Sequence, residues 1–254
     1  MLASPRFRYN GRDWPLLSAN SKMDCYSWSL PAVFTCPGMR ARKGDICSAC
    51  YARIGRYAMP TVAEPQAARL AWTIETLADD PRRWVDAMAN AIECSGNRFR
   101  WHDSGDVFSA SYARALVRVS RATPHVRQWA PTRSWRVKEL LPHLRRWHRL
   151  GHVNVTPSAV AIGDAPPVVR GLGAGQTVHL GDAPDGCRDC PKEKAGSCSA
   201  AGCFDCWARD SEPVSFHVHG HAGTQRATPP SDSRVRRHAE TVRQFVPLRI
   251  EVAQ

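Results

Sequence analysis

The chain has 254 residues, of which 43% are hydrophobic and 23% charged, so it can bury a substantial core as one large domain or two small ones. Its formal net charge of +12 favours a polyanionic partner such as nucleic acid or another anionic substrate, although a generally basic proteome would give the same charge. The sequence shows neither a signal-peptide core nor a run of about 18 apolar residues. We therefore expect no membrane segment and a cytoplasmic location, where disulfides are rare.

The first part of the chain combines a polar start with a long helical region. Residues 1–29 are polar and interrupted by Pro and Gly, which predicts an extended lead-in. The apolar run 30–35 predicts the first buried strand, and a Pro-Gly pair after it predicts a turn. Apolar residues at helical spacing over 67–77 and 84–92 then predict two helices.

Strand and helix patterns alternate along the rest of the chain. The further predicted strands are 98–101, 126–130, 153–156, 177–180 and 213–219, and the further predicted helices are 111–122 and 137–149. Such alternation is typical of parallel strands with helices outside. We therefore predict an α/β fold, a parallel (β/α)6-like partial barrel over residues 30–222, with a cysteine-rich metal-binding insertion at 181–208 and a basic tail at 223–254.

Three cysteines follow the first predicted strand with the spacing C-x10-C-x2-C, namely Cys36, Cys47 and Cys50. Three thiolates can hold three irons of a [4Fe–4S] cluster and leave the fourth iron open. A Cys3His zinc site with a distant fourth ligand is the competing interpretation, and buried thiols without metal are a third. The count of three and the position at a strand end favour the iron–sulfur cluster.

A second set of five cysteines lies downstream, at Cys187, Cys190, Cys198, Cys203 and Cys206. Two C-x2-C pairs with twelve residues between them are typical of a zinc ribbon, and a Cys-Pro step also occurs in ferredoxin cluster loops. Because five thiols exceed one four-ligand site, we expect one to be spare or to reach the first cysteine set, with Cys198 as the candidate. The set predicts a second metal, either zinc or a second [4Fe–4S] cluster.

The segment HDSGD, residues His102 to Asp106, follows the second predicted strand. A turn with an aspartate or serine capping the next helix would explain part of it. Two aspartates, a histidine and a glycine in five residues exceed what a cap needs. We therefore predict catalytic roles for His102, Asp103 and Asp106, and cofactor contacts for Ser104, Gly105 and Asp106.

Two more residues belong to this predicted site. Arg133 follows the third predicted strand, where its guanidinium group can bind a carboxylate or phosphate in bidentate fashion, although a solvated arginine would fit equally well. Tyr51 follows the last cysteine of the first set directly. We predict a catalytic role for Arg133 and a cofactor contact for Tyr51.

The motifs SLPAVFTCPG…CSACYA…GRY, FRWHDSGDVFS and C-x2-CP…C-x2-CW together resemble the phage gene product 88 family, known from mycobacteriophages and other actinobacterial phages. The resemblance covers roughly residues 28–222. It implies a phage protein in the cytoplasm of the host cell. It implies no particular reaction, since that family has no settled activity.

A more distant resemblance is to radical S-adenosylmethionine enzymes, in which a three-cysteine loop follows the first strand of a (β/α)6 partial barrel. In those enzymes a Gly-Gly-Glu-like motif ends the second strand and holds the amino group of the cofactor. The resemblance places Ser104, Gly105 and Asp106 at that motif, and it implies S-adenosylmethionine as cofactor and an electron donor as partner. This chain departs from the usual C-x3-C-x2-C spacing, and Tyr51 follows the last cysteine instead of preceding it.

Three hypotheses for function follow. The preferred one is an iron–sulfur enzyme of the radical S-adenosylmethionine type, with a second metal on the downstream cysteines. The alternative is a zinc-stabilised phage protein that binds nucleic acid without redox chemistry. The third is a cluster-bearing regulator or nuclease-like protein that does not use S-adenosylmethionine.

Overall fold

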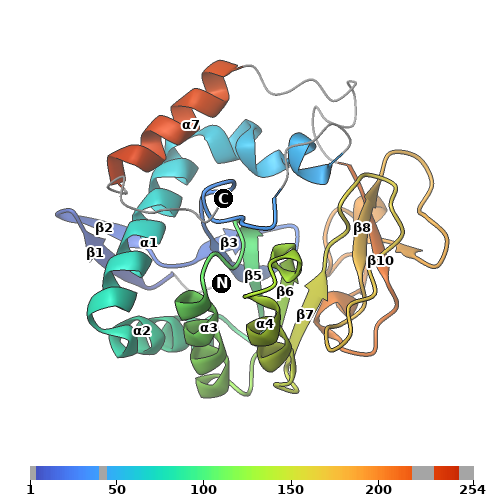
Figure 1. Ribbon diagram of the computed structural model, residues 1–254, viewed down its shortest axis with the longest axis horizontal. Helices are drawn as coiled ribbons and strands as arrows, with labels where there is room; N and C mark the ends of the chain where they lie inside the picture. Colours follow the sequence, from blue (N-terminus) through green and yellow to red (C-terminus); the bar gives the residue numbers. More distant parts are fainter. Residues whose placement is uncertain (1–3, 40–44, 219–231, 246–254) are drawn as a thin grey trace.

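A computed structural model describes residues 4–39, 45–218 and 232–245 of the chain. Its centre is a five-stranded sheet in the order β3-β4-β5-β6-β7, in which β4 to β7 are parallel and β3 is an antiparallel edge (Figure 1). The five strands are β3 (Ser18–Asn20), β4 (Cys25–Ser29), β5 (Arg98–Ser104), β6 (Arg127–Thr132) and β7 (Val153–Pro157). Because β4 to β7 run parallel, their carboxyl ends meet at one edge of the sheet, and their spatial order equals their order in the chain.

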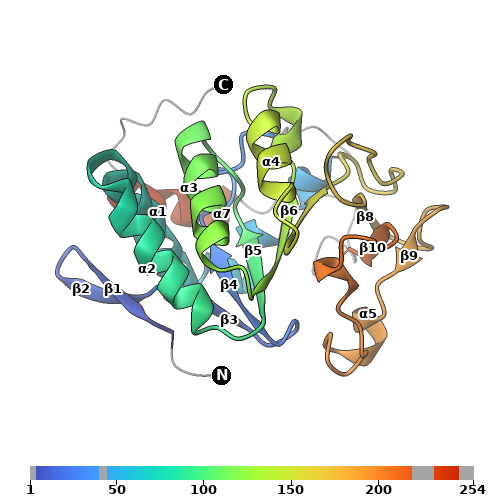
Figure 2. The same cartoon turned by 90° about the horizontal axis from the view of Figure 1, so that it is seen from below.

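Four helices pack in chain order along one face of this sheet (Figures 1 and 2). They are α1 (Pro60–Asp79), α2 (Pro81–Glu93), α3 (Ala110–Ala122) and α4 (Leu141–His148). The predicted break between the first two helices is confirmed, because the side chain of Asp80 accepts hydrogen bonds from the first amides of α2. The α/β alternation predicted from the sequence is thus confirmed for the central sheet.

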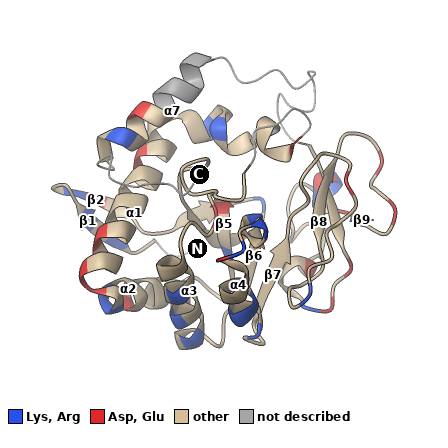
Figure 3. Ribbon diagram, in the orientation of Figure 1, with Lys and Arg blue, Asp and Glu red and all other residues tan. Residues whose placement is uncertain are grey.

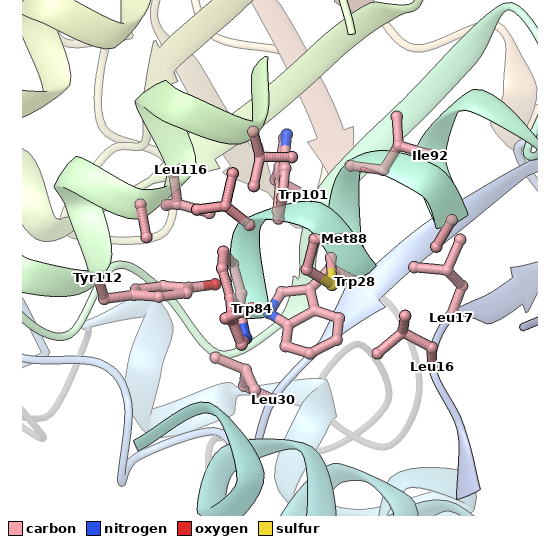
Figure 4. Packing of buried hydrophobic residues seen from close by; sticks show 14 of the residues in the cluster. Leu16, Leu17, Trp28, Leu30, Trp84, Met88, Ile92, Trp101, Tyr112 and Leu116 are labelled. Carbon is pink, nitrogen blue, oxygen red and sulfur yellow. The ribbon is translucent and has the colours of Figure 1, made fainter. Parts of the chain in front are cut away.

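Large aromatic side chains fill the layer between helices and sheet. The indole of Trp84 on α2 packs edge-on against Trp28 of β4 at 6.0 Å and against Tyr112 of α3 at 5.7 Å (Figure 4). All three residues are fully buried. Edge-to-face packing adds to the free energy of burial, so this cluster fixes the helices on the strands that carry the site.

The opposite face of the sheet is covered by the C-terminal part of the chain. A second sheet has the order β8-β10-β9, all parallel, and consists of β8 (Gln176–His179), β9 (Arg188–Asp189) and β10 (Val214–His217). A parallel bridge from Ser158 to Gln176 joins the end of β7 to β8. A separate small core forms here, made of Met23, Cys25, Trp129, Cys198 and Trp207. The cysteine-rich segment therefore packs on the face that the helices leave free.

The two ends of the described chain pack on α1. Strands β1 (Arg6–Tyr9) and β2 (Arg12–Pro15) form an antiparallel hairpin, and α7 (Asp232–Phe245) lies along α1 (Figure 1). Phe245 meets the ring of Trp14 at 5.6 Å, and Val242 belongs to the main core. The region predicted as a basic tail thus includes a packed helix, and its residues 246–254 lie outside the described part of the chain.

The extended lead-in predicted for residues 1–29 contains four strands, β1 to β4, in its described part. The prediction of the first parallel strand at 30–35 is wrong, because that strand is β4 and the run 30–35 forms turns. The helix predicted at 137–149 begins only at Leu141, because Pro142 lacks an amide hydrogen and suits the first turn of a helix. The described strands form sheets of five, three and two strands, so the (β/α)6 partial barrel stays a prediction.

Candidate functional site

The loop that follows β4 carries the first cysteine set and crosses the carboxyl edge of the sheet. Its described parts, residues 30–39 and 45–59, hold three short 3-10 turns, η1 (Ile46–Ala49), η2 (Tyr51–Arg53) and η3 (Gly55–Ala58). The side chain of Asp45 caps η1 by accepting a hydrogen bond from the Cys47 amide at 2.8 Å. Ile46 donates to the carbonyl of Val160, just beyond β7, at 2.9 Å. The loop therefore spans from the first parallel strand to the last.

The three thiols of this loop share one environment. Burial, then the carboxylate of Asp106 and the thiols of Cys50 and Cys47, raises the pKa of Cys36 well above its ordinary value. Burial raises the pKa of Cys47 to about 12 and also raises that of Cys50. Because each thiolate would repel the others, the set favours neutral thiols unless a cation binds.

No metal geometry is formed in the described part of the chain. There, no group of three or more His, Cys, Asp or Glu side chains is arranged to hold a metal ion. The three thiols are neighbours, but they are not arranged as the ligands of one metal site.

Arg133, at the end of β6, reaches back to the cysteine loop. Its Nη1 atom donates to Cys47 Sγ at 2.5 Å and lies 3.4 Å from Asp45 Oδ1. The side chain is only 12% exposed, and its Nε atom has no partner among the described residues. The predicted anion-binding arginine is thus placed beside a thiol and a carboxylate of this chain.

Asp106 joins the ends of β5 and β6. Its Oδ1 atom accepts from the Val107 amide at 2.7 Å and from Thr132 Oγ1 at 2.6 Å, and its Oδ2 atom accepts from the amides of Arg133 at 2.7 Å and Ser134 at 3.1 Å. Burial raises the pKa of Asp106, and these four hydrogen bonds oppose that rise. Since both oxygens are occupied, Asp106 acts as an organiser of the strand ends.

Two glycines let the cysteine loop lie directly on these strand ends. A Cβ atom at Gly38 would stand 2.2 Å from the carbonyl oxygen of Arg133. Gly105 has a φ of +80°, and a Cβ atom there would stand 2.5 Å from Thr35 Oγ1. Gly105 thus allows the cysteine loop to pack closely on the end of β5.

His102 occupies a strained position at the end of β5. Its φ is 53°, which is uncommon for a residue with a side chain. Its Nε2 atom lies 2.8 Å from the hydroxyl of Tyr112, and burial, followed by the charge of Arg100, lowers its pKa to about 3. His102 is therefore a neutral imidazole at physiological pH.

Asp103 is held by two tyrosines of the cysteine loop. Tyr51 donates its hydroxyl hydrogen to the Asp103 carbonyl at 2.5 Å, and Tyr57 donates to Asp103 Oδ2 at 3.2 Å. The two rings meet edge-on at 5.5 Å. Tyr51, predicted as a cofactor contact, thus links the cysteine loop to β5 through its hydroxyl group.

Three consecutive residues of β5 carry buried polar atoms without a partner in the described part of the chain, namely His102 Nδ1, Asp103 Oδ1 and Ser104 Oγ. A buried polar atom left unpaired costs about 1 to 3 kcal/mol. Such atoms gathered at one strand end are typical of a surface that binds water or a polar ligand.

The second cysteine set separates into four thiols and one. Burial raises the pKa of Cys206, and the thiols of Cys190, Cys198 and Cys203 add to the effect. Burial is also the main cause that raises the pKa of Cys190 and of Cys198, and other thiols of the same four contribute. For Cys187 burial is the only resolved cause. Four of the five predicted ligands are therefore electrostatic neighbours.

Polar groups surround these four thiols. Arg188 donates to Cys203 Sγ from both Nη atoms at 3.5 Å and pairs with Asp205 at 2.7 Å. The backbone of Lys192 donates a hydrogen bond to the thiol of Cys190. Hydrogen bonds of this kind favour the thiolate, the form that binds a metal.

Two residues of the region were missed from the sequence. Cys25 of β4 is buried beside Cys198, and burial raises its pKa to about 12. The guanidinium group of Arg100 on β5 lies 4.7 Å from the ring centre of Trp129 and opposes the raised pKa of both Cys25 and Cys206. The available signal was an arginine alternating with aromatic residues in the strand RFRW.

Fold and strand-end residues together define an α/β protein with a cysteine-bearing loop across the carboxyl edge of a mostly parallel sheet. The model of a family described as Gene product 88 matches residues 8–162, more than half of the chain. The chain therefore belongs to the gene product 88 family, as its motifs predicted, and the match includes the first cysteine set and HDSGD.

No curated protein and no solved structure matches it. In the part of the chain that the structure describes, no helix is both long and apolar enough to cross a bilayer.

Proposed function

We propose that this phage-family protein is an iron–sulfur enzyme of the radical S-adenosylmethionine type, with a [4Fe–4S] cluster on Cys36, Cys47 and Cys50. The observation that carries the proposal is the gathering of these three thiols on one loop, which leaves the first parallel strand and packs on the ends of the next two. Parallel α/β sheets bind their ligands outside the carboxyl ends of their strands.

The donor set fits such a cluster in chemistry, although ligand spacing is not formed. Thiolates are the usual ligands of iron–sulfur clusters, and three of them leave one iron open for a small molecule. Cys47 lies in η1, and Cys50 stands between η1 and η2, so these two thiols belong to one run of short turns. When bound, the cluster would supply an electron to S-adenosylmethionine at its open iron.

The end of β5 supplies the groups that would hold this cofactor. The unpartnered Asp103 Oδ1 can accept a hydrogen bond from an ammonium group, and the unpartnered Ser104 Oγ can donate or accept one. The unpartnered Nε of Arg133 can donate to a carboxylate or a phosphate. His102 stays neutral and offers Nδ1 as a further polar contact. Asp106 contributes by positioning, because its oxygens are already used.

The second cysteine set would bind its own metal, zinc or a second cluster, through Cys190, Cys198, Cys203 and Cys206. The support is their shared surroundings and the donors from Arg188 and Lys192. Cys190, Cys198 and Cys203 lie on loops beside a two-residue strand and a four-residue helix, and Cys206 lies in the 3-10 turn η5 (Asp205–Trp207). They therefore have little regular structure to hold them. A metal there would clamp the segment to the free face of the sheet.

The test of the enzyme proposal is reductive cleavage of S-adenosylmethionine. Anaerobically reconstituted protein would be reduced with dithionite, and the products methionine and 5′-deoxyadenosine would be quantified. We expect both products from the wild type and neither from Cys50→Ala. Asp103→Asn should weaken cofactor binding while the iron content stays unchanged. A protein that holds a full cluster but neither binds nor cleaves S-adenosylmethionine would contradict the enzyme proposal and favour a cluster-bearing regulator.

The alternative, a zinc-stabilised protein that binds nucleic acid, is supported by the net charge of +12 and the four-thiol set. It leaves the unpartnered polar atoms at the end of β5 without a role. Colourless protein with zinc and no iron would favour it.

A further inference from the structure

The outer surface of α3 carries one sign of charge only. Arg114, Arg118 and Arg121 recur at intervals of four and three residues, so they lie on one side of the helix, opposite the buried Tyr112 and Leu116. All three arginines are exposed, and the helix contains neither Asp nor Glu. They extend over about 10 Å at the rise of 1.5 Å per residue. Figure 3 shows blue segments and no red along the ribbon of α3.

The neighbouring helix extends the charge. α4 packs beside α3 and adds the exposed Arg146, and the exposed Arg149 follows at its C-terminal end. Figure 3 shows blue segments on α4 as well. Among the described residues, none of these five guanidinium groups forms an ion pair, although Asp86 and Glu93 are exposed on α2 next to α3. The five arginines, Arg114, Arg118, Arg121, Arg146 and Arg149, are called the arginine face below.

Helix stability does not explain this arrangement. Cations near a helix C-terminus interact well with the helix dipole, which accounts for Arg121 and Arg149. Arg114 lies in the N-terminal half of α3, and like charges four residues apart, such as Arg114 and Arg118, destabilise a helix. A bound polyanion would relieve this repulsion.

We propose that the arginine face docks on the phosphate backbone of nucleic acid, independently of the cysteine sites. A row of unpaired guanidinium groups along a helix matches the regular charges of a nucleic-acid strand, and arginine binds phosphate in bidentate fashion. Because the face offers few groups other than arginine, the contact reads backbone rather than base sequence. The face lies in the helical layer, whereas the second cysteine set packs on the other side of the sheet, so docking leaves that side free.

The test measures binding of the full chain to a random-sequence DNA duplex of about 20 base pairs over a range of salt concentrations. Arg114→Gln/Arg118→Gln/Arg121→Gln would be compared with Arg6→Gln/Arg8→Gln/Arg12→Gln on the β1–β2 hairpin. Both triple variants lower the net charge from +12 to +9, and both change exposed residues. Circular dichroism would check that each variant folds, and Arg146→Gln/Arg149→Gln provides a second variant of the face.

We expect the logarithmic salt slope of the α3 variant to be shallower by about 2.7, which is three contacts at about 0.9 each. Its affinity should fall at least about tenfold, while the hairpin variant stays close to wild type. Equal losses of DNA affinity in both triple variants would show that only the net charge matters, and this result would overturn the proposal. Tight binding to anionic lipid vesicles without binding to DNA would overturn it as well.

Discussion

The Nη1 atom of Arg133 lies 2.5 Å from the sulfur of Cys47 and 3.4 Å from Asp45 Oδ1. Arg133 follows β6, whereas Cys47 belongs to the loop after β4, so this contact ties the cysteine loop to a strand end two positions away in the sheet. Burial favours the neutral thiol of Cys47, and the guanidinium group opposes that effect. Arg133 is thus the group that prepares Cys47 to act as a thiolate.

Replacing this arginine should make Cys47 less reactive. Without the cation, the pKa of Cys47 should rise further, by at least about one unit, since hydrogen bonds to charged groups contribute about 1.5 to 3 kcal/mol. In reduced, metal-free Arg133→Gln protein, alkylation of Cys47 by iodoacetamide should therefore slow about tenfold relative to the exposed Cys94, as followed by mass spectrometry. Arg136→Gln, which changes a neighbour that contacts Gly38, should leave the ratio unchanged. A ratio unaffected in Arg133→Gln would show that the contact has no electrostatic role.

Asp106→Asn should destabilise the fold. The amide group would replace an oxygen that accepts two hydrogen bonds, so two buried donors would lose their acceptor, each at about 1 to 3 kcal/mol. We expect the free energy of unfolding in urea to fall by about 2 to 5 kcal/mol. The matched control is Asp86→Asn on the exposed side of α2, which should change stability by less than about 0.5 kcal/mol. A loss no larger than that of the control would contradict the organising role.

His102 should make stability depend on pH below about 6.5. The unfolded chain protonates this histidine near pH 6.5, whereas in the folded chain the pKa is about 3. The unfolded state therefore binds the extra proton between these values, and wild-type stability should fall as pH falls through this window, by about 1.4 kcal/mol per unit from this group. Urea unfolding from pH 7.5 to 5.5 should show a smaller fall in His102→Gln. In His125→Gln, which changes an exposed loop residue, the wild-type slope should persist. Identical slopes in wild type and His102→Gln would exclude the buried neutral imidazole.

The second cysteine set should respond unequally to single substitutions. If Cys198 belongs to the four-thiol set and Cys187 does not, Cys198→Ser should lose the second metal and Cys187→Ser should retain it. Elemental analysis of the purified variants, with thermal unfolding as a second readout, measures this directly. Loss of metal in Cys187→Ser with retention in Cys198→Ser would reverse the assignment.

Local patterns predicted the βα units well where they were strong. The helix pair around Asp80 and the strand that leads into His102 were found because apolar spacing and capping residues are local signals. Strand β4 was missed because two of its five residues are serines, and the more apolar run after it drew the prediction. That run contains Pro31 and is followed by Pro37, and it turns to bring Cys36 over the sheet.

The sequence allowed the residues of the candidate site to be predicted, but not the hydrogen-bond and packing partners of those residues. Asp106 of HDSGD was identified as a site residue. Its hydrogen bonds from Thr132 and from two backbone amides could not be predicted, because these donors lie 26 to 28 residues away in the sequence. The choice of Cys198 as the spare thiol was guided by spacing alone, whereas its neighbours are set by packing against Trp129 and Trp207. Arg100 was missed because a charged residue in a buried strand has meaning only once its surroundings are known.

The central claim is that Cys36, Cys47 and Cys50 hold an iron–sulfur cluster. The most direct measurement is the iron, acid-labile sulfide and zinc content of anaerobically purified protein, beside a Cys36→Ala/Cys47→Ala/Cys50→Ala variant and a Cys94→Ala control, which removes an exposed cysteine outside both sets. We predict iron and sulfide in the wild type and the control, with a marked loss of both in the triple variant. Zinc without iron in the wild type, even after anaerobic reconstitution, would contradict the claim.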